Sequence, residues 1–165
     1  MEKLHLYLVR HCESFGNHEN IFQGQLDLDI SATGEKQLAL LALRFRNIPI
    51  DAVYSSPLKR AYKTAEAVDL YHSLPIIKLP ELMEVNVGAL SGMKLDKAFA
   101  DYPVFAEKWQ NSPQNCIFPE GETTAEVYDR AKKALARVKA DCMGQTAVIT
   151  SHGFLLRCMA CEILE

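Results

Sequence analysis

The chain has 165 residues, of which 48% are hydrophobic and 24% are charged, and its formal net charge is −3. This length allows one compact domain with a core of its own, and the composition excludes a disordered chain. The slightly negative charge gives no reason to expect nucleic acid or an acidic membrane surface as a partner, so local cations would have to bind any anionic ligand.

The N-terminus and the cysteines indicate the compartment. The first apolar stretch has only about six residues before Arg10 and His11, too short for a secretory signal or a membrane span. An odd number of irregularly spaced cysteines, at positions 12, 116, 142, 158 and 161, predicts reduced thiols and a cytoplasmic protein. Cys158 and Cys161 form a CxxC pair, which we interpret as two core thiols, because a zinc site needs a second pair and the sequence has none.

The first half of the chain alternates strand and helix patterns. Residues 4–9 (LHLYLV) are predicted to form a buried strand. A helix is predicted over 31–46, with Ser31 as N-cap, and a short strand over 51–55. The next helix, over 57–71, is expected to carry Pro57 in its first turn. A third strand covers 75–79.

The second half continues the alternation after a mixed segment over 84–122, which has a short helical piece near 94–101. A long amphipathic helix is predicted over 123–141, with Thr123 and Glu126 as a capping box. A last strand over 146–151 and a final helix from Gly153 follow. The pattern predicts an α/β sandwich around a mostly parallel sheet, with no repeat or linker that would divide the chain.

Unusual polar residues follow each predicted strand. Arg10 and His11 come after the first strand, Arg60 lies in the first turn of the helix after the second, Glu84 follows the third and His152 the last. In open α/β sheets ligands bind beyond the carboxyl ends of the strands. We therefore expect these groups to converge on one crevice.

Together these residues have the chemistry of a phosphate site. Guanidinium groups bind phosphate oxygens bidentately, a neutral imidazole can attack phosphorus, and a carboxylic acid such as Glu84 can protonate the leaving oxygen. Taken singly, a histidine at a strand end is usually structural and an arginine at a helix start is usually a surface charge, so only their joint placement supports this interpretation. No carboxylate cluster that would hold a metal is recognisable, and no metal or cofactor is expected.

Six motifs in order resemble the histidine phosphatase superfamily, also called the phosphoglycerate mutase-like family. They are LVRHCES with Asn17, FQGQLDLDISATGEKQ, VYSSPLKRAYKTAEAV, LMEVNVGALSG, PEGET and TAVITSHGFLLR. The resemblance covers nearly the whole chain. It implies a three-layer sandwich with a mostly parallel central sheet flanked by helices, formed by one domain over residues 1–165.

The resemblance also implies the roles of the site residues. His11 would be phosphorylated, and Glu84 would protonate the leaving oxygen and then deprotonate the attacking water. The residues that would hold the phosphoryl group or approach the substrate are Arg10, Arg60, His152, Asn17, Gln23 and Gly24. A small-molecule phosphomonoester is the expected partner.

The chain departs from the family pattern at two places. Cys12 stands where the family has glycine, which is tolerable unless this position has a positive φ. A thiol beside a cationic pocket is also hypothesised to have a lowered pKa and to oxidise readily. The other departure is at the C-terminus, where the family has further chain including a strand, so the domain is expected to be short there, with an exposed sheet edge.

Three functions remain open. A phosphomonoesterase is favoured over a phosphoglycerate mutase-type enzyme, because mutases of the family resemble longer chains with extra segments in the interval that runs here from Glu84 to His152. The sequence also lacks a cluster of cations for a second phosphate or carboxylate, since the only ones over 85–122 are Lys94, Lys97 and Lys108. A catalytically silent phosphate-binding module is the third possibility. The sequence leaves open the substrate and the oligomeric state. It also leaves open whether the aromatic residues of the segment over about 85–122 line a pocket or pack in the core; they are Phe99, Tyr102, Phe105 and Trp109.

Overall fold

The computed structural model describes residues 3–164 and contains a sheet of four parallel strands. The strands are β1 (His5–Arg10), β2 (Ala52–Ser55), β3 (Ile76–Lys78) and β4 (Thr146–Ser151), in the order β1-β4-β2-β3. In this order β4 pairs with β1 and with β2, and β3 pairs with β2. The carboxyl ends of all these strands therefore meet at one edge of the sheet, as the α/β prediction requires.

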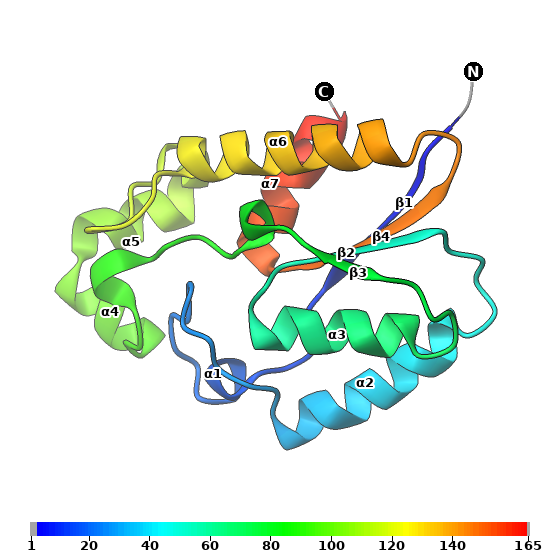
Figure 1. Ribbon diagram of the computed structural model, residues 1–165. Helices are drawn as coiled ribbons and strands as arrows, with labels where there is room; N and C mark the ends of the chain where they lie inside the picture. Colours follow the sequence, from blue (N-terminus) through cyan, green and yellow to red (C-terminus); the bar gives the residue numbers. More distant parts are fainter. Residues whose placement is uncertain (1–2, 165) are drawn as a thin grey trace.

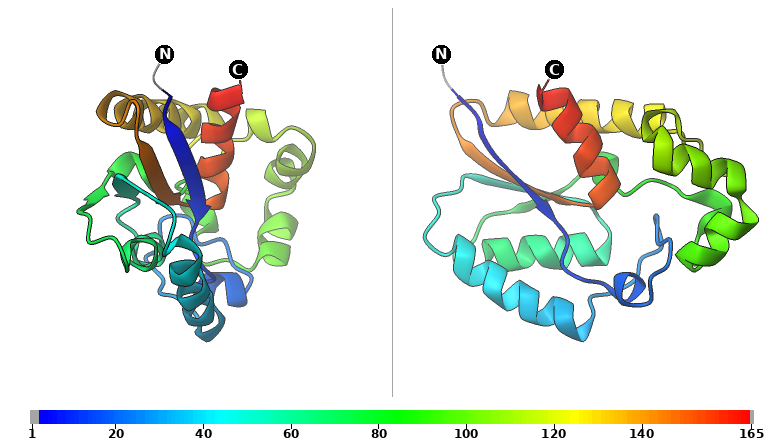
Figure 2. Two further views of the ribbon diagram at one scale, coloured as in Figure 1. Left: turned by 90° about the vertical axis from the view of Figure 1, so that its right-hand side faces the viewer. Right: turned by 180° about the vertical axis from the view of Figure 1, so that it is seen from behind.

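Helices cover both faces of the sheet (Figures 1 and 2). Helices α2 (Ala32–Phe45) and α3 (Lys59–Asp69) lie below it in Figure 1, and α6 (Thr124–Asp141) and α7 (Gly153–Leu164) lie above it. This arrangement confirms the three-layer sandwich. Three further helices lie beyond the carboxyl ends of the strands: α1 (Phe15–His18), α4 (Leu95–Asp101) and α5 (Pro103–Asn111).

Local signals explain where the helices begin. The Ser31 side chain accepts a hydrogen bond from the Gly34 N–H at the start of α2, and Thr123 and Glu126 form the expected capping box of α6. Helix α3 begins later than predicted, at Lys59, because Leu58 has an extended backbone and acts as its N-cap. Pro57 therefore precedes the helix, and its placement in the first turn was wrong.

The sheet divides the core into two parts. Alternate residues of β4 point to opposite faces, so Ile149 packs in the larger cluster under α6 and α7, while Val148 packs in the smaller one near α3. The prediction of a buried strand over residues 4–9 is correct for the strand but wrong for its burial. Strand β1 pairs only with β4 among the described residues, and none of its side chains is fully buried.

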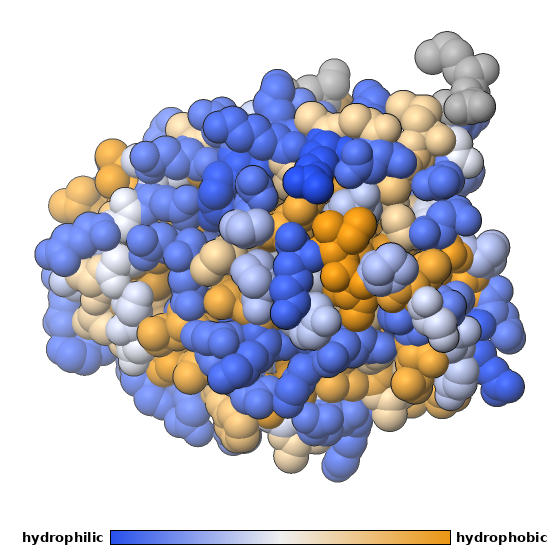
Figure 3. Space-filling view, in the orientation of Figure 1, coloured by the Kyte–Doolittle hydropathy of each residue, from blue (hydrophilic) through white to orange (hydrophobic). Residues whose placement is uncertain are grey.

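The surface is mainly hydrophilic on the face shown in Figure 3, with an apolar patch where β3 lies in Figure 1. None of the helices within residues 3–164 is long and apolar enough to span a membrane. The mixed segment between β3 and α6 contains, besides α4 and α5, three 3-10 turns: η1 (Pro80–Leu82), η2 (Gly88–Leu90) and η3 (Pro113–Asn115).

Candidate active site

The two histidines of the predicted site are neighbours because of strand pairing. Arg10 of β1 pairs with Ser151 of β4, and the His11 N–H donates to the Ser151 carbonyl at 2.9 Å. His11 and His152 each come one residue after this pair, and their ring centroids lie 5.2 Å apart. Both rings are buried, with 8% of His11 and none of His152 exposed.

The protonation state of His11 follows from its surroundings. Its Nδ1 lies 2.7 Å from the Cys12 carbonyl oxygen, which can only accept, so Nδ1 carries the proton and Nε2 carries the lone pair. Burial, opposed by this hydrogen bond and assisted by the charges of Arg60 and Arg10, lowers the pKa of His11 to about 4. The imidazole is therefore neutral at pH 7 and able to act as a nucleophile through Nε2.

Arg60 is a buried cation held by a neighbouring loop. Its Nη1 donates to the Leu26 carbonyl and its Nη2 to the Gly24 carbonyl, both at 2.7 Å. Gly24 has a φ of +48°, and a Cβ there would lie 2.6 Å from Val87 Cγ2, so this turn requires glycine. Burial lowers the pKa of Arg60 to about 10, which leaves it positively charged at pH 7.

His152 is held by Ser56, whose Oγ lies 2.8 Å from His152 Nε2. Burial and the charge of Arg60 lower its pKa well below the usual value, so this ring is also neutral at pH 7. Within residues 3–164, two buried side-chain nitrogens lack a hydrogen-bond partner, Arg60 Nε and His152 Nδ1. Such atoms are rare in protein interiors, and a catalytic role or a bound ion is among their explanations.

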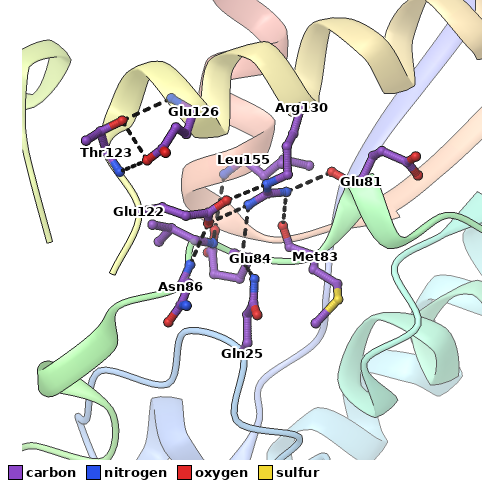
Figure 4. Close-up of polar contacts among 11 residues, drawn as sticks. Gln25, Glu81, Met83, Glu84, Asn86, Glu122, Thr123, Glu126, Arg130 and Leu155 are labelled. Atoms are coloured by element: carbon purple, nitrogen blue, oxygen red, sulfur yellow. Dashed lines mark hydrogen bonds and ion pairs between the residues drawn. The ribbon is translucent and has the colours of Figure 1, made fainter. Parts of the chain in front are cut away.

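Glu84 reaches the N-terminus of α7. Its carboxylate accepts hydrogen bonds from the N–H groups of Phe154 and Leu155, each at 3.2 Å, and from that of Val85 at 3.0 Å. The partial positive charge of a helix N-terminus favours a carboxylate there. Figure 4 shows Glu84 and Leu155 within the wider set of polar contacts around this segment.

One cavity of about 310 Å³ connects these groups. Of the eight predicted site residues, His152 does not line the cavity but lies fully buried against His11. The predicted residues that do line it are Arg10, His11, Asn17, Gln23, Gly24, Arg60 and Glu84. A neutral imidazole, two guanidinium groups and a carboxyl group that line one cavity are a set suited to phosphoryl transfer.

Asn17 and Gln23 are tied together by Ser14, a fully buried residue that the sequence interpretation did not single out. The Ser14 hydroxyl donates to Gln23 Oε1 at 2.7 Å, and its backbone N–H donates to Asn17 Oδ1 at 3.1 Å. Ser14 and Asn17 thereby form a capping box for α1. A sequence signal for it existed, since serine followed three residues later by an amide is a helix-start pattern.

The outer part of the cavity was largely missed from the sequence. Its apolar wall includes Trp109, Phe118 and Phe154, and Arg157 adds a cation at an exposed position on α7. Arg157 follows Gly153 by one helical turn, which was the available signal that both face the same way. Both alternatives left open for the aromatics occur. Trp109 lines the cavity and also packs against the core, Phe105 is buried in the core, and Phe99 and Tyr102 pack against it without lining this cavity.

Two expectations about cysteines need correction. Cys12 has no positive φ, so the backbone tolerates it, but burial raises the pKa of its thiol, which makes the hypothesis of a lowered pKa wrong. Its N–H donates to Thr64 Oγ1 at 3.0 Å. Of the CxxC pair, Cys158 is buried but Cys161 is exposed, so only Cys158 is a core thiol. Among the described residues, no group of three or more His, Cys, Asp or Glu side chains could hold a metal ion.

Comparison with known proteins identifies the class. The sequence profile of the histidine phosphatase superfamily (branch 1) matches residues 6–165, and the chain belongs to this family. It is 39% identical to phosphoserine phosphatase 1 of Hydrogenobacter thermophilus over 159 residues, which covers 96% of this chain and 75% of that protein. The chain is therefore a histidine phosphatase enzyme.

Two further relatives indicate the breadth of the family. A probable phosphoglycerate mutase of Escherichia fergusonii is 32% identical over 161 residues, covering 98% of this chain and 75% of that protein. Among solved structures, a mycobacterial glucosyl-3-phosphoglycerate phosphatase in complex with VO3 superimposes with a TM-score of 0.88 and 26% identity, covering 96% of this chain and 81% of that one. The fold is thus that of phosphoglycerate mutase-like proteins.

Proposed function

We propose that this enzyme hydrolyses a small-molecule phosphomonoester in two steps, without a metal, through a phosphohistidine on His11. In the first step His11 Nε2 attacks phosphorus, the bond to the ester oxygen breaks, and Glu84 gives its proton to that oxygen as the alcohol leaves. In the second step Glu84 takes a proton from water, the water oxygen attacks phosphorus, and the N–P bond breaks to release inorganic phosphate.

The observation that carries this proposal is the hydrogen bond from His11 Nδ1 to the Cys12 carbonyl. It holds the ring in the tautomer whose Nε2 is unprotonated, and the lowered pKa of His11 keeps it so at pH 7. A nucleophile must be unprotonated before it attacks, so the site needs no separate base for the first step.

The proposal assigns charge stabilisation to Arg10, Arg60 and His152. The unpartnered Arg60 Nε supports this role, and so does His152 Nδ1, which is a donor when Nε2 accepts from Ser56. The Gly24 carbonyl supports Arg60, while Asn17 and Gln23 lie on the cavity wall where a substrate would enter. The whole of residues 1–165 is proposed to act as one domain in a reducing, cytoplasmic compartment; the odd number and irregular spacing of the cysteines support this, and none of the five forms a disulfide.

A panel of phosphomonoesters assayed with the full chain and with His11→Ala tests the proposal. We expect phosphate release by the wild type in the presence of a metal chelator, and a loss of at least about 1,000-fold in the variant, because the nucleophile is gone. A rapidly quenched reaction should contain an acid-labile phosphoenzyme only in the wild type. Equal turnover by both proteins would show that His11 is not the nucleophile, and no turnover by either would favour a phosphate-binding module.

A mutase-type activity is the second candidate, and its specific support is the similarity to a probable phosphoglycerate mutase. The same two steps lead to it when an alcohol, rather than water, receives the phosphoryl group. Incubation with 3-phosphoglycerate and a trace of the bisphosphate distinguishes the two activities. We expect inorganic phosphate as the main product; accumulation of 2-phosphoglycerate without phosphate would instead identify a mutase.

A further inference from the structure

Arg130 of α6 and Glu122, just before this helix, form an ion pair outside the cavity (Figure 4). Arg130 Nε donates to Glu122 Oε1 at 2.8 Å, and Nη2 donates to Oε2 at 2.9 Å, so the pair is bidentate. Only 21% and 20% of the two side chains are exposed. A bidentate, partly buried pair of this kind fixes the relative position of the segments that carry it.

The remaining donors of Arg130 bind the backbone that leads to Glu84. Nη1 donates to the carbonyls of Glu81 and Met83, both at 2.8 Å, and Nη2 donates to the carbonyl of Glu84 at 3.3 Å. The guanidinium thereby uses every N–H donor that it has. This segment lies outside the sheet, so its carbonyls depend on side-chain donors for partners.

Glu122 fixes the backbone on the other side of Glu84. Its Oε2 accepts from the Asn86 N–H at 2.7 Å, and its own N–H donates to the Asn86 carbonyl at 2.9 Å. Gln25 Nε2 adds a bond to the Glu84 carbonyl at 3.1 Å. The main chain is therefore held at Met83, at Glu84 and at Asn86, while the carboxylate of Glu84 is held at the N-terminus of α7.

We propose that Arg130 and Glu122 are positioning residues that hold the Glu84 carboxyl group within reach of the leaving oxygen. Neither residue lines the cavity, so they act through Glu84 and not on the substrate. This inference rests on the proposed function of Glu84 as proton donor. It gives the PEGET segment, which contains Glu122, and helix α6, which contains Arg130, an effect on catalysis through the position of Glu84.

Substrates with different leaving groups distinguish a residue that positions Glu84 from a residue that only stabilises the fold. An alkyl alcohol leaves only when its oxygen is protonated, whereas p-nitrophenolate leaves well without a proton. A displaced Glu84 therefore slows the hydrolysis of an alkyl phosphate much more than that of p-nitrophenyl phosphate. The quantity to compare is kcat/KM, because it reports the steps up to phosphorylation of His11 and not the later attack by water.

The experiment measures kcat/KM for both substrates in Arg130→Lys, Glu122→Gln, Glu84→Gln and Arg137→Lys. Lysine keeps the charge of Arg130 but cannot form its fork of hydrogen bonds. Arg137 is the matched control, because it lies on the same helix in an exposed ion pair with Asp141. Thermal unfolding and the inhibition constant of inorganic phosphate are measured for every variant.

For Arg130→Lys and Glu122→Gln we expect kcat/KM to fall by about 10- to 100-fold with an alkyl phosphate and by less than about 3-fold with p-nitrophenyl phosphate. Phosphate inhibition should be unchanged, and Arg137→Lys should resemble the wild type. If Glu84→Gln discriminates between the substrates but these two variants do not, positioning by Arg130 and Glu122 is refuted. If Glu84→Gln itself does not discriminate, the proton-donor role fails, and the inference with it. Should one variant fail to fold, the other decides.

Discussion

The imidazole rings of His11 and His152 lie 5.2 Å apart although 141 positions separate them in the sequence, because Arg10 pairs with Ser151 across two parallel strands. Both rings are buried, and burial together with the charges of Arg60 and Arg10 opposes a proton on either imidazole. One strand pair thus places the proposed nucleophile beside a second neutral imidazole. The same environment has consequences for stability that can be measured.

The lowered pKa of His11 predicts that acid destabilises the fold at mild pH. The unfolded chain takes up a proton on His11 below its ordinary pKa of about 6.5, whereas the folded chain does so only near pH 4. Stability is therefore fully present above pH 6.5 and is lost progressively as the pH falls towards 4, by up to about 3 kcal/mol from this group.

Urea unfolding at pH 7 and pH 4.5 checks this expectation. The variant His11→Asn keeps a polar side chain but does not titrate, so it should lose less stability over this interval than the wild type. The carboxylates titrate in both proteins and cancel in the comparison. Equal losses in the two proteins would show that burial does not oppose protonation of His11.

The inner part of the site could be predicted from the sequence because it depends on strand ends. Arg10 is the last residue of β1, and His11 and His152 directly follow β1 and β4, so parallel pairing brings them together whatever the intervening chain does. The outer part of the site could not be predicted from the sequence, because Trp109 and Arg157 reach the cavity only through the packing of α5 and α7. The exposure of β1 was missed for a related reason: an apolar pattern does not show whether a strand has one neighbour or two.

Gly24→Ala is expected to weaken both the fold and phosphate binding. The new Cβ would lie 2.6 Å from Val87 Cγ2 and 3.0 Å from the Val85 carbonyl, on a backbone with positive φ. The strain should cost about 1–3 kcal/mol of unfolding free energy, and displacement of the Gly24 carbonyl from Arg60 should raise the inhibition constant of phosphate about 10-fold.

Gly92→Ala provides the control for this substitution. Gly92 also has a positive φ, +79°, but a Cβ there meets nothing closer than 3.8 Å. It should lower stability by about 1 kcal/mol and leave phosphate inhibition unchanged. The same phosphate inhibition in Gly24→Ala as in the wild type would show that the Gly24 carbonyl does not position Arg60.

Cys12 is expected to be chemically inert despite its place beside His11. Burial raises the pKa of the thiol, and the thiolate is the reactive form, so Cys161 on the surface should react first with iodoacetamide at pH 7. Mass spectrometry of the partly labelled protein checks the order. Cys12→Gly should retain activity within about 3-fold and lose about 1 kcal/mol of stability, since glycine adds backbone freedom to the unfolded chain. Peroxide inactivation of the wild type but not of this variant would contradict the expectation.

Arg157 is expected to favour substrates that carry a second negative group. It lines the cavity from an exposed position on α7, one turn after Gly153, and the cavity holds Glu84 as its one carboxylate within the described residues. In the proposed mechanism Glu84 is protonated as the acid, so Arg10 and Arg60 balance the charge of a phosphate dianion. The charge of Arg157 is then available for a carboxylate on the alcohol part of the substrate.

A pair of substrates that differ only in a carboxylate tests this expectation. O-phosphoserine has the carboxylate and phosphoethanolamine lacks it, while the phosphate and amine are the same. The wild type should prefer phosphoserine, and Arg157→Gln should raise its KM about 10-fold while changing the KM for phosphoethanolamine by less than about 2-fold. Arg137→Gln, on the exposed side of α6, should alter neither value. If Arg157→Gln changed both substrates equally, the guanidinium would contribute only to the general positive potential of the cavity, and discrimination would have to come from its apolar wall.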